Sequence, residues 1–236
     1  YQCDGASMKT ASNLPQNKNG FKYFDKKGGL NKTDISEIIE LAESHEIMDD
    51  LILSEATGTF KAIKTDLLET YCAHLRKLII EGVDPHNLKP LIGLKIAVDA
   101  GNGSGGFFAT KILEPLGADI SGSQFLTPDG NFPNHMPNPE DETAMASLSA
   151  AVKSSNADLG LIFDTDVDRF AAVDSKGNEI NRNELIALAA ALIAKDHPNT
   201  TVVTDSITST QLTDFLVGNL NLKHLRFKRG YKNVIN

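Results

Sequence analysis

Two patterns of apolar and polar residues follow one another along the chain, and the change falls near residues 82–85. Before it, residues 21–24 alternate as a strand does, and apolar stripes at helical spacing predict helices over 33–42 and 65–81. After it, short apolar runs alternate with helical stripes. The strands are expected at 94–98, 118–125, 158–163, 170–174, 201–205 and 224–228, and the helices at 103–116, 141–155, 183–194 and 209–216. This alternation predicts an α/β fold with a parallel sheet and right-handed crossovers.

An acidic loop follows the apolar run 158–163. It carries Asp164, Asp166 and Asp168 at alternate positions, followed by Arg169. Three carboxylates this close cannot all be ionised in a dry site without a cation, because like charges raise one another's pKa. Oxygen donors suit a hard divalent ion, Mg²⁺ before a softer metal. Ligand sites in α/β sheets also lie at the carboxyl ends of strands. The loop therefore predicts a Mg²⁺ site.

Other interpretations of this loop were weighed on the same spacing. An EF-hand needs Gly at its sixth position and Glu at its twelfth, and counting from Asp164 these positions hold Arg169 and Ser175, so a calcium loop is excluded. A solvated acidic turn fits the spacing. A phosphatase-type site in which Asp164 is the nucleophile fits it as well, so both interpretations stay open.

Three further loops carry polar residues. Ser12 lies between two strand-like stretches, and Lys22 lies on the second of them, as in a hairpin with a long tip. The glycine-rich turn 99–106 matches neither the dinucleotide-binding nor the P-loop pattern, so we expect it to pack a helix on the sheet. The long loop 127–139 contains four prolines and indicates a binding loop or a rigid wall between domains.

Composition narrows the class of protein. The chain has 236 residues, of which 41% are apolar and 23% charged, as is typical of a globular protein. Its net charge of −8 argues against a nucleic-acid partner. Cys3 and Cys72 lack the spacing of a disulfide framework, which favours a reducing compartment. No apolar run reaches the roughly 18 residues that span a bilayer, so we expect no membrane segment. The chain begins without Met and ends in what resembles the start of a helix, which suggests a piece of a longer protein.

Taken together, these segments resemble the α-D-phosphohexomutase family, which comprises phosphoglucomutase, phosphomannomutase and phosphoglucosamine mutase. The serine loop and the acidic loop occur in the family's order, with the proline loop between them. The matching residues are Thr10-Ala11-Ser12, Asn19-Gly20-Phe21-Lys22, Val98-Asp99-Ala100-Gly101-Asn102-Gly103, Pro128-Asp129-Gly130-Asn131-Phe132-Pro133-Asn134-His135 and Asp164-Thr165-Asp166-Val167-Asp168-Arg169.

The resemblance implies a mechanism and a role for each residue. A phosphoserine at Ser12 would give its phosphoryl group to a hexose monophosphate, and the resulting hexose bisphosphate would return the other one. Mg²⁺ would be held by an oxygen of that phosphoserine and by the carboxylates of Asp164, Asp166 and Asp168. Lys22 matches the general base, and Arg169 matches the residue that binds phosphoryl or sugar oxygens.

The resemblance also implies a division into domains, each of the βαβ type with a mixed sheet sandwiched by helices. Residues 1–85 would be the C-terminal part of domain I, 86–196 domain II, and 197–236 the start of domain III. The implied partners are hexose phosphates, with no nucleic acid and no membrane. An intracellular location follows, in the cytoplasm or a plastid. The oligomeric state is left open.

Three positions depart from the family pattern. Asn13 stands where the family has a histidine, Ile207 where many members have a lysine, and Tyr231 where some have a histidine. These substitutions motivate a second hypothesis, a catalytically weakened homologue that keeps a role in metal or phosphosugar binding. The phosphatase with Asp164 as nucleophile remains the third.

Overall fold

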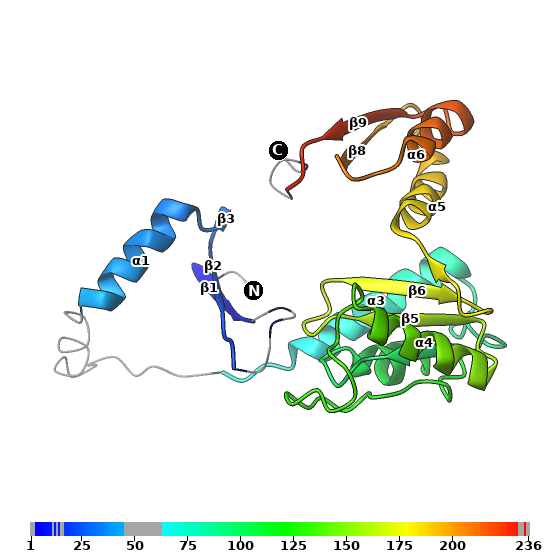
Figure 1. Cartoon of the computed structure of the whole chain (residues 1–236), viewed down its shortest axis with the longest axis horizontal. Coiled ribbons are helices and arrows are strands. Elements are labelled where there is room, and N and C mark those ends of the chain that lie inside the picture. Colours follow the sequence, from blue (N-terminus) through cyan, green and yellow to red (C-terminus); the bar gives the residue numbers. More distant parts are fainter. Residues whose placement is uncertain are drawn as a thin grey trace.

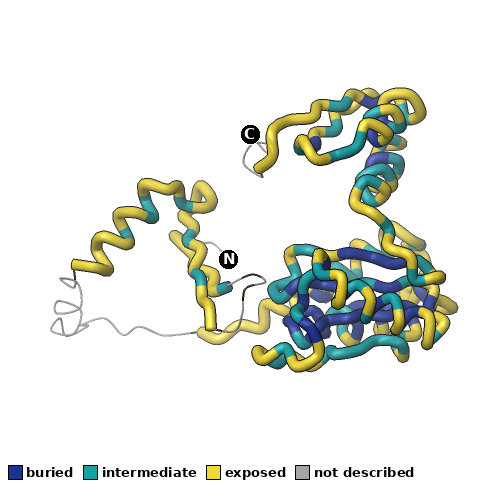
Figure 2. The backbone as a smooth tube through the Cα atoms, in the orientation of Figure 1, coloured by how far each residue is buried: buried dark blue, intermediate teal, exposed yellow. Residues whose placement is uncertain are grey.

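The computed structural model describes residues 3–10, 12, 14, 17–44, 63–230 and 234. Their elements form an N-terminal hairpin with one helix, a central α/β unit, and a C-terminal unit around a separate two-stranded sheet (Figure 1). The side chains buried from solvent are concentrated in the central unit (Figure 2).

The N-terminal hairpin pairs β1 (Gly5–Lys9) with β2 (Phe21–Asp25) in an antiparallel register in which Met8 lies opposite Lys22. A short strand, β3 (Gly28–Gly29), continues the sheet, and helix α1 (Lys32–Ser44) follows. The helix begins here because the side-chain oxygen of Asn31 accepts hydrogen bonds from the backbone N–H groups of Thr33 and Asp34. The strand expected at 21–24 and the helix expected at 33–42 are confirmed.

The central sheet has the strand order β4-β5-β6-β7, where β4 is Ile96–Asp99, β5 Leu159–Phe163, β6 Phe170–Asp174 and β7 Glu179–Ile180. The pair β4–β5 is parallel, and the pairs β5–β6 and β6–β7 are antiparallel. The α/β fold with a mixed sheet, as the resemblance implies, is therefore confirmed. The parallel sheet expected from strand–helix alternation is wrong for β5, β6 and β7, because short loops rather than helices join these strands.

Helices cover both faces of this sheet, because successive side chains of a strand point to opposite faces. On β4, Ile96 and Val98 join one core cluster with helix α3 (Leu67–Val83) and the wide helical segment η1 (Phe108–Leu113). Ala97 joins the other cluster, which packs against helix α4 (Glu142–Ser155). On that face a Cβ at Gly160 would lie 2.5 Å from a Val152 methyl group, so α4 packs very close to the sheet.

Helix α3 packs on the central unit rather than on the hairpin that precedes it in sequence. Its Cys72 is fully buried in the cluster that contains Ile96 and Val98, and Leu75 and Ile79 pack beside it. The packing of this helix therefore makes it part of the central unit, together with residues after 85. The domain limits stay a prediction.

Two elements of the central unit differ from the sequence prediction. The strand expected at 118–125 is wrong: only two isolated bridges form, Lys95 with Asp119 and Asp99 with Gln124, because a turn between them breaks the extended run. The helix expected at 103–116 begins later, since the glycine-rich turn uses residues 101–105, and it is wound widely, with the N–H of Glu114 donating to the carbonyl of Ala109.

The C-terminal unit pairs β8 (Thr201–Asp205) with β9 (Lys223–Phe227) in parallel. Helix α6 (Thr210–Asp214), continued by η2 (Phe215–Asn219), makes the crossover, which confirms the predicted strand–helix–strand unit. Helix α5 (Arg182–Ala194) begins at a capping box made by Asn181 and Glu184. It packs on this unit through a core formed by Ala190, Leu212, Leu216 and Leu222 (Figure 1).

Candidate active site

The acidic loop joins β5 to β6 and is closed by its own backbone. Asp164 directly follows the buried end of β5 and is itself fully buried. Its N–H donates to the carbonyl of Arg169 at 3.1 Å, and its carbonyl accepts the N–H of Val167 at 3.2 Å. Val167 has a φ of 66°, a conformation that a β-branched residue adopts at a cost of about 1–3 kcal/mol. Such strain is typical of loops shaped for a function.

The three carboxylates of this loop converge. Oxygen atoms of Asp164, Asp166 and Asp168 lie within 4.8 Å of one another. Burial raises the pKa of Asp164, the nearby Asp168 adds to this, and a hydrogen bond from the backbone N–H of Arg169 acts against it. A cation at the centre of the cluster would favour the ionised form of all three.

An unsatisfied oxygen also points to a cation. Oδ1 of Asp166 is buried without a hydrogen-bond partner among the described residues, and so is Oγ1 of Thr165. A buried carboxylate oxygen without a partner is costly, and native proteins rarely keep one. Three carboxylates with an unsatisfied oxygen form a donor set that fits a hard divalent cation.

The loop that carries Ser12, here the serine loop, contacts the acidic loop, although Thr10 and Asp166 are 156 positions apart in the sequence. Oγ1 of Thr10 donates to Oδ2 of Asp166 at 2.5 Å and accepts the N–H of Ser12 at 2.9 Å. Nη2 of Arg169 donates to Oγ of Ser12 at 3.2 Å. Ser12 has a φ of 52°, in the left-handed region that non-glycine residues rarely adopt. The structure thus places Ser12 beside the acidic loop, held from both sides.

Arg169 connects the serine to the carboxylates. Its backbone N–H and its Nε donate to the two oxygens of Asp164 at 2.9 and 3.0 Å, and Nε lies 3.6 Å from Oδ1 of Asp168. Because both Asp164 oxygens accept hydrogen bonds from Arg169, this carboxylate is poorly prepared to attack a phosphate. The geometry therefore disfavours the hypothesis of an aspartate nucleophile.

Lys22 lies on β2 and makes no hydrogen bond or ion pair within the described ranges. The antiparallel register places Met8 opposite Lys22, and Thr10 continues the ladder by donating its N–H to the carbonyl of Gly20. Since side chains alternate along a strand, Lys22 and Thr10 project from the same face of the hairpin. That face is the one turned toward Asp166.

A cavity of about 320 Å³ opens beside Ser12. The serine loop and β1 contribute Lys9 and Lys18 to its wall, and the proline loop contributes Gly130 and Phe132. The sequence interpretation did not single out Lys9, Lys18 or the hydroxyl of Thr10. The available signal was the position of Thr10 two residues before the serine, from which a side-chain oxygen can accept the N–H of Ser12 as in an ST-turn.

The glycine-rich turn packs against the acidic loop, a contact that the sequence did not predict. The N–H of Ser104 donates to the carbonyl of Thr165 at 3.0 Å, and a Cβ at Gly103 would lie 3.1 Å from the Thr165 Cα. The lack of a side chain at Gly103 thus allows the backbone of the turn to approach the backbone of the acidic loop and support it.

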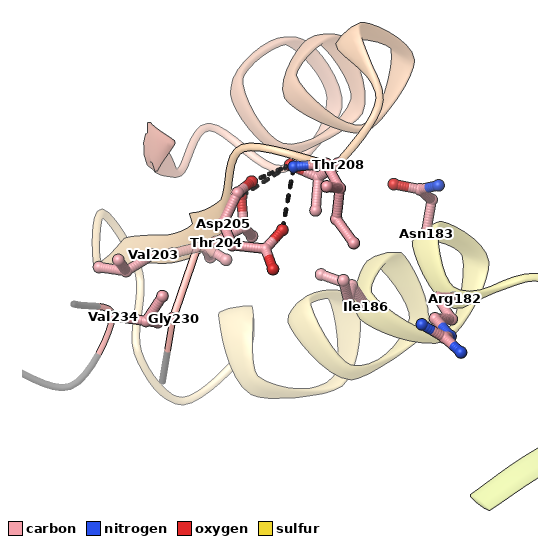
Figure 3. A pocket seen from close by; sticks show the side chains of 11 residues that line it. Arg182, Asn183, Ile186, Val203, Thr204, Asp205, Thr208, Gly230 and Val234 are labelled. Carbon is pink, nitrogen blue, oxygen red and sulfur yellow. Dashed lines mark hydrogen bonds between the residues drawn. The ribbon is translucent and has the colours of Figure 1, made fainter. Parts of the chain in front are cut away.

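A second cavity, of about 510 Å³, lies in the C-terminal unit between α5 and β8 (Figure 3). Its wall includes Arg182, Ile186, Asp205 and Ile207. Oδ1 of Asp205 accepts the N–H of Ile207, whose side chain is 58% exposed. Two other positions that depart from the family pattern, Asn13 and Tyr231, lie outside the described residues.

Comparison with known proteins places this arrangement in a family. Residues 69–177 match the family model "Phosphoglucomutase/phosphomannomutase, alpha/beta/alpha domain II". The phosphoglucomutase of Neisseria gonorrhoeae is 34% identical over 212 residues, which cover 89% of this chain and 42% of that protein. The chain belongs to the α-D-phosphohexomutase family. The resemblance noted from the sequence is thereby confirmed.

Solved phosphohexomutase structures share the fold. A phosphoglucomutase/phosphomannomutase family protein from Burkholderia thailandensis has a TM-score of 0.76 at 24% identity, over 99% of this chain and 47% of that chain. N-acetylphosphoglucosamine mutase of Aspergillus fumigatus, solved in complex with GlcNAc-6P and magnesium, has a TM-score of 0.58 at 16% identity, over 98% and 57%. This phosphohexomutase chain thus spans about half the length of the relatives it matches. None of its described helices is long and apolar enough to cross a membrane.

Proposed function

We propose that this chain carries the phosphoserine and the metal site of an enzyme that interconverts hexose 1-phosphates and hexose 6-phosphates through a bisphosphate intermediate. The observation that supports this best is the contact between Ser12 and the acidic loop. Arg169 donates to the serine oxygen while its Nε binds Asp164, and Thr10 connects the serine backbone to Asp166. A serine held this way beside three carboxylates suits phosphoryl transfer.

The carboxylates of Asp164, Asp166 and Asp168, with an oxygen of phosphorylated Ser12, would hold Mg²⁺. The cation would neutralise negative charge that develops on the phosphoryl group during transfer, which is usually the largest contribution to such catalysis. The unsatisfied Oδ1 of Asp166 supports this donor set. The Aspergillus relative, which was solved with magnesium, supports the choice of ion.

Lys22 and Arg169 would act on the proton of the sugar hydroxyl and on the Ser12 oxygen that leaves. In the first transfer the bond between Ser12 Oγ and phosphorus breaks as the bond from a sugar hydroxyl to phosphorus forms. Lys22 would accept the hydroxyl proton, and the Ser12 oxygen, stabilised by the hydrogen bond from Arg169, would take up a proton from solvent as it leaves. The bisphosphate then turns over and the same steps run in reverse, which returns a phosphoryl group to Ser12.

The substrate class follows from the same site. Lys9 and Lys18 line the cavity beside Ser12, where the phosphate groups of a hexose phosphate or a hexose bisphosphate would lie. The Aspergillus relative was solved with GlcNAc-6P, a hexosamine phosphate.

Replacement of Ser12 tests the proposal. Conversion of glucose 1-phosphate to glucose 6-phosphate is measured with Mg²⁺ and a trace of glucose 1,6-bisphosphate, on the longest protein that carries this sequence. Ser12→Ala should abolish turnover, because the phosphoryl group then has no acceptor. Ser7→Ala, on the exposed strand β1, is the matched control and should leave turnover unchanged. Full turnover by Ser12→Ala would contradict the proposal.

The weakened homologue is the second candidate, and Ile207 favours it. Its apolar side chain lies at the cavity of the C-terminal unit, at a position where the resemblance leads us to expect a lysine. This candidate predicts that the protein binds Mg²⁺ and hexose phosphate without turning the substrate over. Ile207→Lys should then raise turnover.

A further inference from the structure

A buried hydrogen-bond network lies at the end of β4, outside the groups assigned to phosphoryl transfer. Asp99 is fully buried, and His135, from the proline loop, is 8% exposed. Nε2 of His135 lies 3.0 Å from both oxygens of Asp99, and Nδ1 lies 3.0 Å from the carbonyl oxygen of Met136. Both ring nitrogens therefore face groups that accept hydrogen bonds.

Counting donors assigns the protons. A carbonyl oxygen can only accept, so Nδ1 of His135 carries a proton. Asp99 accepts three further hydrogen bonds, from the N–H of Gly101 at 2.9 Å, from Nε2 of Gln124 at 2.7 Å and from the hydroxyl of Ser147 at 3.1 Å. Three donors thus converge on this carboxylate, and its oxygens act as acceptors. Nε2 of His135 must then carry a proton as well.

We propose that His135 is a positioning residue, an imidazolium held between Asp99 and the Met136 carbonyl, that fixes the proline loop 127–139 as a wall of the Ser12 cavity. A buried ion pair of this kind is stable only when hydrogen bonds satisfy the rest of both groups, and the donors on Asp99 supply them. The protonation state does not depend on the proposed function, whereas its effect on turnover rests on that function.

The electrostatic surroundings agree with a charged ring. The hydrogen bond that His135 donates to Asp99 raises the pKa of His135 above its ordinary value, burial opposes this, and the Met136 carbonyl and the carboxylate of Asp141 raise it further. The ring of Phe125 also packs edge-on against His135, at 5.6 Å between ring centroids, and carries no charge.

The ring fixes the loop by close packing on the βα turn. A Cβ at Gly101 would lie 2.9 Å from Cε1 of His135, and the φ of Gly101 is 51°, so this position requires glycine. Asn102 holds the loop at two further points, because its side chain donates to the carbonyl of Thr127 and accepts from the side-chain amide of Asn134. Gly130 and Phe132 lie between these two attachments and line the cavity.

The chain offers a built-in comparison. His224 is partly buried, but its two ring nitrogens face the hydroxyls of Thr204 and Thr213, at 2.8 and 2.9 Å. A hydroxyl can donate or accept, so a neutral ring is satisfied there. Burial lowers the pKa of His224, and the charge of Arg226 lowers it further. One histidine should therefore be doubly protonated while the other is neutral.

Nitrogen-15 NMR of the histidine side chains tests the proposal on the wild-type chain. At about pH 7.5, above the ordinary histidine pKa of ~6.5, His135 should show two protonated ring nitrogens and His224 only one. In Asp99→Asn, the His135 ring should become singly protonated at that pH. A neutral His135 ring in the wild type would overturn the proposal.

Amide hydrogen exchange tests the effect on the loop. In His135→Gln, which can donate one hydrogen bond but carries no charge, exchange of the amides of 130–135 should rise by roughly tenfold or more, the scale of a lost charged hydrogen bond. His224→Gln is the matched control and should leave these amides unchanged. Unchanged exchange in His135→Gln would overturn the positioning role, whatever the outcome of the turnover assay. If His135→Gln exchanges the amides of 130–135 faster but converts glucose 1-phosphate at the wild-type rate, the positioning of the loop stands, and only its contribution to turnover is contradicted.

Discussion

Thr10 offers the sharpest test of the contact between the serine loop and the acidic loop. Its hydroxyl donates to Oδ2 of Asp166 and accepts the N–H of Ser12, so one oxygen atom connects the two loops. Thr10→Val keeps the shape of the side chain and removes both hydrogen bonds. Oδ2 of Asp166 would then lose its partner, while Oδ1 already has none among the described residues.

The size of the effect follows from the role of this hydroxyl. If Asp166 binds the cation, Thr10 is a partner that orients a metal ligand, and losing such a partner costs about 10–100-fold in metal affinity or activity. We expect the Kd for Mg²⁺ of Thr10→Val to rise by that factor. Isothermal titration calorimetry at constant ionic strength measures it, and Mn²⁺ serves as a second probe.

Thr10→Ser is the matched control, because it keeps the hydroxyl and removes only a methyl group. Its Kd should stay within about threefold of the wild type, since only some packing is lost. Equal Mg²⁺ affinity of Thr10→Val and the wild type would refute the assignment of Asp166 as a ligand oriented by Thr10. Equal weakening by both variants would show that packing, not the hydroxyl, matters.

Three further outcomes are expected. Lys22→Arg keeps the charge but does not give up its proton, so kcat should fall by about 10²–10⁴-fold, and phosphorylation of Ser12 by glucose 1,6-bisphosphate should slow as well; an unchanged kcat would remove Lys22 as the base. Gly160→Ala places a methyl group 2.5 and 2.7 Å from valine methyl groups on α4 and β6, so urea denaturation should show a loss of about 1–3 kcal/mol, whereas Gly82→Ala, whose Cβ meets nothing within 4 Å, should lose none. Asp99 raises the pKa of His135, so the pair stabilises the folded protein fully below the unfolded histidine pKa of ~6.5. This stabilisation is lost as pH rises through the folded pKa, and the urea midpoint should fall with it. In Asp99→Asn the urea midpoint should not show this fall.

Much of the central fold could be predicted because the apolar patterns are local. The run 158–163 is bounded by polar residues, buried on both faces, and forms β5 nearly as expected. The helices α4 and α5 begin at side-chain caps that lie in the sequence next to their apolar stripes, at Asp141 and Asn181. The acidic loop was recognisable because three carboxylates at alternate positions need a common physical explanation.

The failures come from long-range contacts. The apolar pattern of 118–125 suits a strand, yet a turn held by the Asp119 side chain leaves only isolated bridges. The packing of α3 on the central core depends on Cys72 meeting strands that come more than twenty residues later. The link from Thr10 to Asp166 spans 156 positions, and no local pattern announces it.

Peptide mapping around Ser12 tests the central claim most directly. The chain is incubated with Mg²⁺ and glucose 1,6-bisphosphate, and intact-mass spectrometry followed by peptide mapping locates any added phosphate. We predict one phosphate on Ser12, which leaves when a hexose monophosphate is added with Mg²⁺ and stays when the metal is removed by a chelator. A chain that takes up no phosphate, or takes it up at another residue, would contradict the claim that Ser12 is the phosphoryl carrier of this site.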